Sequence, residues 1–170
     1  SEVESSNGKN YFIKGYPEKK VKVGASESMS KSKKNTIDPE EIITNYGADA
    51  VRLFILSDSP PEKDVQWSEQ GMLGAYKFIN KFWLIHQNIK NEIFSSNKKE
   101  EAKEKSIEEN FIKFTNETIY KVTKNLESFH YNVIIANLHE TYNFLSKLKI
   151  NKISKSILIE NYVKILTVMN

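Results

Sequence analysis

The chain has 170 residues, enough for one domain or slightly more, and its 39% hydrophobic and 28% charged residues are ordinary for a globular protein. It contains no cysteine, which excludes a disulfide framework and a zinc site built on thiolates. No apolar run approaches the length of a membrane span, and the first residues lack the pattern of a signal peptide. The net charge of +3 is too small to indicate a nucleic-acid partner by itself.

The first quarter of the chain predicts a small β structure. Residues 1–10 are polar and are expected to be irregular. Two short strands are predicted over residues 11–14 and 20–23, joined by a turn at residues 15–18 that contains glycine and proline. A hairpin of this size is only marginally stable alone, so we expect it to pack on a preceding part of a larger protein.

A polar loop rich in lysine and serine follows the predicted hairpin. Its residues are Glu27, Ser28, Met29, Ser30, Lys31, Ser32, Lys33, Lys34 and Asn35. Lysines supply mobile positive charge, and serines supply hydroxyl donors. Between Lys19 and Lys34 there are six lysines and one acidic residue, which is a patch suited to a polyanion. The loop is therefore predicted to bind phosphate, and a solvated basic turn is the alternative.

Two short helices are predicted after the loop. Asp38 is expected to cap the first, Pro39 to occupy its first helical position and Gly47 to end it. Because carboxylates occupy this helix start, a bound phosphate is expected to rely on the lysines instead. The second helix is predicted over residues 48–56. It is almost wholly apolar and is expected to be buried on several sides. Arg52, the only arginine, is expected to form a structural ion pair or to bind a carbonyl group rather than to be catalytic.

Four long amphipathic helices are predicted from Ser68 onward. Ser68 is expected to cap the first, and Trp67 to anchor the loop before it. A charged connector is predicted over residues 95–105, a break over 127–130, and a last helix that begins near residues 151–152. The residues expected to face inward are Met72, Tyr76, Ile79, Phe82, Trp83, Ile89 and Ile93, then Ile107, Phe111, Phe114, Thr118, Val122 and Leu126, then Ile134, Leu138, Tyr142, Leu145 and Leu148, and finally Leu158, Tyr162, Ile165 and Met169.

These stripes predict a packed core and an antiparallel bundle rather than a cofactor site. The apolar pattern of the last helix still continues where the chain stops, so we expect a larger parent protein. The histidines are His86, His130 and His139, and no two of them have the spacing of metal ligands on one helix face. A metal site is therefore not expected, and neither a P-loop nor a nucleophile–base pattern is present.

The loop and the residues after it resemble a known family. Residues 29–32, Met-Ser-Lys-Ser, followed by Lys-Lys-Asn, resemble the second signature loop of class I aminoacyl-tRNA synthetases. Residues 46–54 resemble the helix pair that follows this loop in the large aliphatic-specific members. Residues 59–83 are similar to leucyl-tRNA synthetases in particular, and residues 129–140 are similar to the family's third bundle helix. The chain departs from the family at Ser28, where a lysine is usual, and it lacks the first signature, the nucleotide-binding half and the leucine pocket.

The resemblance implies a mainly α fold. A small head of β-hairpin, loop and short helices would precede an antiparallel helical bundle like the anticodon-binding domain of class I synthetases. Residues 1–66 would then be the end of a catalytic domain, and residues 67–170 a helical tRNA-binding domain that is truncated at its C-terminus.

The resemblance also implies a function and a site. The parent would be a cytoplasmic, monomeric leucine–tRNA ligase, which forms leucyl-adenylate from leucine and ATP, with Mg²⁺, and transfers leucine to leucine tRNA. Lys31 would be the catalytic residue that stabilises the leaving pyrophosphate, and the ATP-binding residues would be Met29, Ser30, Lys31 and Ser32. Lys33 and Lys34 are further candidates for contact with tRNA or phosphate. The 170 residues alone are expected to be inactive, to bind no cofactor and to contact no membrane.

Three alternatives remain open at the level of the sequence. The parent could be a class I synthetase for isoleucine, valine or methionine, although residues 67–83 argue for leucine. The chain could be a non-catalytic tRNA-binding module derived from a synthetase, and Ser28 would fit such a loss of catalysis. It could also be a structural helical bundle with a basic loop.

Overall fold

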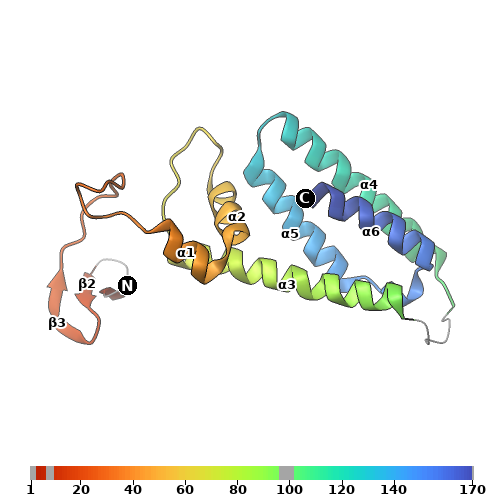
Figure 1. The fold of residues 1–170 in the computed structure, drawn as a ribbon, viewed down its shortest axis with the longest axis horizontal. Coiled ribbons are helices and arrows are strands. Elements are labelled where there is room, and N and C mark those ends of the chain that lie inside the picture. Colours follow the sequence, from red (N-terminus) through yellow and green to blue (C-terminus); the bar gives the residue numbers. More distant parts are fainter. Residues whose placement is uncertain (1–2, 7–9, 96–101, 170) are drawn as a thin grey trace. The chain divides into compact units, whose positions relative to one another are not determined.

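The computed structural model describes residues 3–6, 10–95 and 102–169. The chain divides into two compact units, Ser1–Asp38 and Pro39–Asn170. The first contains a small sheet and the lysine-rich loop, and the second contains the helices, which confirms the predicted mainly α fold (Figure 1). The predicted boundary between residues 66 and 67 separates a catalytic from a tRNA-binding part. It concerns function, whereas the two units differ in their internal contacts, and it stays a prediction.

The first unit contains a three-stranded antiparallel sheet in the order β1-β2-β3. The strands are β1 (Val3–Ser6), β2 (Asn10–Ile13) and β3 (Tyr16–Val21). Val3 pairs with Ile13, and Tyr11 pairs with Val21. The expectation that residues 1–10 are irregular is therefore wrong for β1. A polar segment becomes a strand here because its backbone groups pair with those of β2.

The turn between β2 and β3 is shorter than predicted. It lies at Lys14 and Gly15, and Gly15 has a φ of 80°, which a residue without a Cβ adopts at little cost. The predicted turn at 15–18 is wrong because Tyr16, Pro17 and Glu18 already belong to β3. Proline is tolerated there because β3 is an edge strand with one unpaired side.

The two short helices of the second unit are α1 (Pro39–Tyr46) and α2 (Ala48–Asp58). Pro39 begins α1 as predicted, and Gly47, with a φ of 82°, separates the two helices. The α2 helix extends two residues beyond its predicted end. It buries only Ala50 and Phe54, so the expectation of burial on several sides is wrong within this chain. Arg52 forms the expected ion pair, 2.7 Å from Asp49 on the same helix.

The long helix α3 (Glu69–Phe94) begins as the sequence predicts. The Gly71 N–H donates to the Ser68 hydroxyl at 3.1 Å, which is the expected N-cap bond. Trp67 packs edge-on against Phe54, with ring centroids 5.4 Å apart, and so fastens the loop before α3 to α2. A small apolar cluster joins α2 to the first turns of α3, and its buried members are Ala50, Phe54, Met72 and Ala75.

The remaining helices complete the bundle. They are α4 (Lys105–Glu127), α5 (Tyr131–Lys147) and α6 (Lys155–Met169), with a 3₁₀ turn at Ile150–Lys152. The α4 and α5 helices form a hairpin about the predicted break, and α6 packs along α4 (Figure 1). The buried core of the bundle contains Phe78, Phe82, Ile89, Phe111, Ile135, Leu138, Leu145, Ile153, Leu158, Tyr162 and Ile165.

Three residues predicted to face inward are exposed instead. The exposed fractions are 59% for Trp83, 38% for Tyr76 and 54% for Leu126. Trp83 stacks on His86, with ring centroids 5.2 Å apart, and the His86 ring in turn lies 3.0 Å from the hydroxyl of Tyr162. Whether a residue at the edge of an apolar helix face is buried depends on the neighbouring helix. On α3, His86 rather than Trp83 faces the bundle.

The last helix begins later than predicted. Residues 150–152 form the 3₁₀ turn, and α6 starts at Lys155. The Ser154 N–H donates to Glu108 Oε1 at 2.7 Å, which satisfies a backbone donor at the start of α6 from a neighbouring helix. Of the connector predicted over 95–105, residues 96–101 lie outside the described part, and Lys105 already belongs to α4.

Among the described residues, no helix combines the length and hydropathy needed to cross a membrane. The same part of the chain contains no group of three or more histidine or acidic side chains that could hold a metal ion.

Candidate functional site

The candidate site is the loop of residues 27–35, which lies between β3 and α1. None of its residues is buried, and Ser30 is the only one that is partly covered. With so little of the loop covered, polar contacts between its own residues give it its shape. Two successive turns form its centre, since Lys33 N donates to Ser30 O and Lys34 N donates to Lys31 O, both at 3.2 Å.

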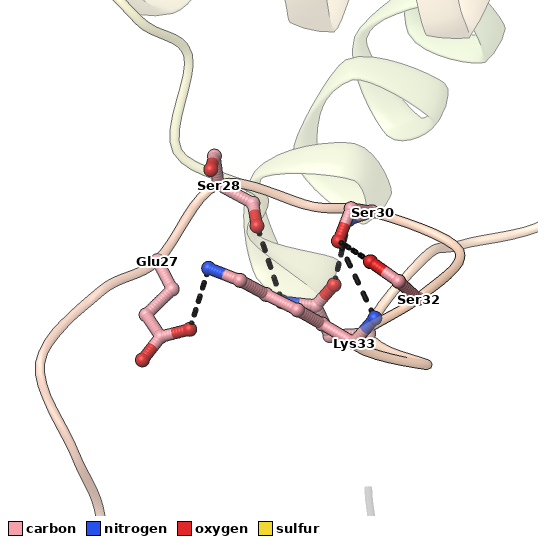
Figure 2. Close-up of polar contacts among 6 residues, drawn as sticks. Glu27, Ser28, Ser30, Ser32 and Lys33 are labelled. Carbon is pink, nitrogen blue, oxygen red and sulfur yellow. Dashed lines mark hydrogen bonds and ion pairs between the residues drawn. The ribbon is translucent and has the colours of Figure 1, made fainter.

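Ser30 is the centre of the polar contacts. Its hydroxyl lies 3.2 Å from that of Ser32 and accepts a hydrogen bond from Lys33 N at 3.3 Å (Figure 2). These contacts are typical of serine in turns, where the hydroxyl bonds to nearby backbone. The predicted residues Ser30 and Ser32 thus shape the loop.

The three loop lysines differ in their surroundings. Lys33 Nζ lies 2.9 Å from Glu27 Oε2, so its charge is locally compensated (Figure 2). Within residues 3–6, 10–95 and 102–169, the ammonium groups of Lys31 and Lys34 have neither an ion pair nor a hydrogen bond. An exposed ammonium on a flexible stem can reach an anion bound above the loop. Lys31 and Lys34 are therefore available for that role, and Lys33 must first leave Glu27.

Asn35 is the residue whose role the sequence did not reveal. Its Oδ1 accepts a hydrogen bond from Ser30 N at 2.8 Å, and its Nδ2 donates to Ser28 O at 3.4 Å. One carboxamide thus joins the end of the loop to its beginning. The signal was present only as an asparagine after two lysines, and nothing in that pattern specifies a partner five or seven residues earlier.

Met29 does not fasten the loop within this chain. This residue is 47% exposed. The predicted residues Met29, Ser30, Lys31, Ser32, Lys33 and Lys34 all lie on this one loop. The next helix, α1, has Glu40 and Glu41 in its first turn, and these acidic side chains disfavour a second anion at that end.

Comparison with protein families identifies the loop and its flanks. Residues 18–68 match the family model described as tRNA synthetases class I (I, L, M and V). This range contains the whole loop together with α1 and α2.

Relatives extend the similarity into the bundle. The leucine–tRNA ligase of Bartonella henselae is 39% identical over 150 residues, which cover 86% of this chain and 16% of the relative. That of Phenylobacterium zucineum is 44% identical over 129 residues, which cover 76% of this chain and 14% of the relative. The chain thus spans 14% to 16% of the length of these two relatives.

A solved structure has the same fold. It is a LeuRS–tRNA–LeuAMS ternary complex from Agrobacterium radiobacter, with a TM-score of 0.71, and the match covers 83% of this chain and 18% of that one. At 22% identity this likeness shows the fold alone. The match to residues 18–68 and the identity to leucine–tRNA ligases over at least three quarters of the chain agree, and the chain belongs to the class I tRNA synthetase family.

Proposed function

We propose that this chain supplies the pyrophosphate-stabilising loop and the tRNA-binding helices of a leucine–tRNA ligase. The observation that carries the proposal is the identity of 39% to 44% with leucine–tRNA ligases over most of the chain. The reaction joins leucine to ATP, releases pyrophosphate and then transfers the leucyl group to leucine tRNA. ATP enters as its Mg²⁺ complex, and leucine binds outside these 170 residues.

Lys31 is the proposed catalytic residue of the loop. In the first step the leucine carboxylate forms a bond to the α-phosphorus of ATP while the bond to the bridging oxygen breaks, and negative charge builds on the leaving pyrophosphate. An ammonium that reaches those oxygens as the bond breaks stabilises the transition state more than bound ATP. The absence of a carboxylate partner for Lys31 in the described part of the chain supports this role.

The other loop residues have supporting roles in this proposal. The hydroxyls of Ser30 and Ser32 shape the loop and donate to phosphate, and Met29 lies beside them at the ATP site. Lys33 and Lys34 add positive potential or contact tRNA phosphates. The bundle from residue 67 onward binds tRNA mainly through lysines on its outer faces, because phosphate contacts provide most of the affinity and little of the specificity. We infer that the whole enzyme acts in the cytoplasm as a monomer.

The first test is amino-acid-dependent pyrophosphate exchange by the product of the complete reading frame that contains this chain. Leucine, isoleucine, valine and methionine are compared in the wild type, Lys31→Ala, Lys34→Ala and Lys14→Ala. We expect exchange with leucine only. Loss of one preorganised donor costs ~3 kcal/mol, so Lys31→Ala should slow exchange about 100-fold. Lys34→Ala should slow it much less, and Lys14→Ala, an exposed lysine of the hairpin turn, should leave it unchanged.

Each other outcome contradicts a definite part of the proposal. Exchange with isoleucine, valine or methionine would assign the protein to another class I synthetase. Absence of exchange with all four amino acids would favour a non-catalytic tRNA-binding module, as Ser28 in place of the usual lysine also would. Equal effects of Lys31→Ala and Lys34→Ala would refute the role given to Lys31 alone.

A further inference from the structure

The Asn35 carboxamide is the feature that closes the lysine-rich loop. Its oxygen accepts from Ser30 N at 2.8 Å, and its nitrogen donates to Ser28 O at 3.4 Å. The two partners fix which end of the amide faces which group, because a backbone N–H can only donate and a carbonyl can only accept. Both halves of one short side chain are thus used to hold two backbone groups on the opposite side of the loop.

Besides the contacts within the two turns, an ion pair between two side chains also joins the ends of the loop. Lys33 and Glu27 form an ion pair at 2.9 Å, but their side chains are 47% and 62% exposed. Such a pair is screened by solvent and orders two long side chains, so it contributes little. Asn35 has two side-chain torsions and makes two bonds to backbone. The carboxamide thus makes two bonds to backbone groups across a loop that has no buried residue, whereas the ion pair joins two exposed side chains.

Lys31 lies in the segment between Ser30 and Asn35, the two residues that this hydrogen bond joins. Ser30, its neighbour, is held by Asn35, and the Lys31 carbonyl accepts from Lys34 N at 3.2 Å in the second turn. Lys34 has a φ of 53°, a left-handed conformation that turns the chain so that Asn35 can reach back to Ser30. The backbone from which the Lys31 side chain extends thus lies between the Asn35 bond at Ser30 and the turn bond that its own carbonyl accepts from Lys34.

We propose that Asn35 is a positioning residue that acts through Lys31. This inference rests on the proposed function, since it assigns Asn35 the task of presenting the catalytic ammonium. Without the carboxamide the loop samples more conformations, and the ammonium of Lys31 is near the leaving pyrophosphate for a smaller fraction of the time. Asn35 makes no contact with substrate in this proposal, so it affects the chemical step and leaves leucine binding unchanged.

A double-mutant cycle in pyrophosphate exchange tests the inference on the product of the complete reading frame. Asn35→Ala should lower kcat about tenfold, which corresponds to ~1.4 kcal/mol, and leave KM for leucine unchanged. The double variant Lys31→Ala/Asn35→Ala should be no slower than Lys31→Ala, about 100-fold below wild type, because a positioned group that is already absent cannot be misplaced. Independent roles would multiply to about 1,000-fold, and that result would overturn the inference.

A second measurement does not depend on activity. Amide hydrogen exchange should show faster exchange of the Ser30 N–H in Asn35→Ala than in wild type, because its acceptor is lost. Asn116→Ala removes an exposed asparagine from α4. It should change neither the hydrogen exchange of the Ser30 N–H nor kcat for pyrophosphate exchange. Unchanged protection of Ser30 in Asn35→Ala would overturn the inference.

The failures of the two proposals are distinguishable. A wild type that is inactive with every amino acid would refute the proposed function and, with it, the coupling to Lys31. An active wild type that loses activity in Lys31→Ala but not in Asn35→Ala would refute the inference alone.

Discussion

Gly71 lies in the first turn of α3, where the backbone approaches the ring of Phe54. A Cβ at this position would lie 2.8 Å from Phe54 Cε2, and that ring is buried against Trp67. We predict that Gly71→Ala lowers the free energy of unfolding of this chain by ~1–3 kcal/mol, because the packed ring must move to admit the methyl group. Urea unfolding followed by circular dichroism measures the change.

Gly74 on the same helix provides the matched control. A Cβ there meets nothing within 4 Å. Gly74→Ala should therefore stabilise the chain by up to ~1 kcal/mol, since alanine is the better helix former. A shift of the unfolding midpoint in the same direction for both variants would contradict the close contact between Gly71 and the Phe54 ring.

At the scale of elements, Glu108 joins α4 to the start of α6. The Ser154 N–H donates to Glu108 Oε1 at 2.7 Å, and hydrogen bonds from the Ser154 backbone and side chain hold the pKa of Glu108 below its ordinary value. A carboxyl pKa that is lowered by folding stabilises the native state above the ordinary pKa, and the stabilisation is lost as pH falls through the lowered one. Glu108→Gln should therefore lower Tm at pH 7.

The pH dependence separates this effect from a general loss of stability. The difference in Tm between wild type and Glu108→Gln should shrink as the pH falls below the ordinary glutamate pKa, because wild-type Glu108 then loses its charge as well. Glu109→Gln is the control, since its ion pair with Lys105 is 3.7 Å long and largely exposed. A difference that is the same at pH 3 and pH 7 would refute the charge-dependent contact.

At the scale of the whole molecule, the two units differ in what stabilises them. All sixteen buried hydrophobic residues among those described lie between Ala50 and Ile165, and none lies in the described part of residues 1–38. Burial of apolar surface is the main source of stability, so the sheet of the first unit has backbone hydrogen bonds but little else. Its local free energy of opening should be small.

Hydrogen exchange of the 170-residue chain tests this difference. Backbone amides of β2 and β3 should exchange more than about tenfold faster than amides in the middle of α4 and α5. The helices provide the internal reference in the same sample. Equal protection of strands and helices would mean that the first unit has a source of stability that its described residues do not display.

The helices could be predicted from the sequence because their causes are local. Apolar residues recur at helical spacing, Pro39 marks a helix start and Ser68 caps another, and each signal acts within one or two turns of the chain. The polar and basic character of the loop can be predicted for the same reason, since its lysines and serines lie within nine consecutive residues.

Contacts between distant residues decided what the sequence could not. The burial of Trp83 depends on which neighbour faces the bundle, and His86 takes that place by contacting Tyr162, 76 residues away. The α6 helix begins where Glu108 meets the Ser154 N–H, 46 residues along the chain. Within the site, the role of Asn35 depends on the left-handed backbone conformation of Lys34. This conformation turns the chain so that the Asn35 side chain reaches Ser28 and Ser30.

The sequence by itself thus determined the helices, the basic loop and the family resemblance, because each rests on residues near one another in the chain. Only the tertiary structure decided which residues at the edge of each apolar helix face are buried. It also decided which loop lysine has its charge compensated by an acidic side chain. Burial and hydrogen bonding are set by the three-dimensional neighbours of a side chain, and these belong to other elements or to the far side of a turn.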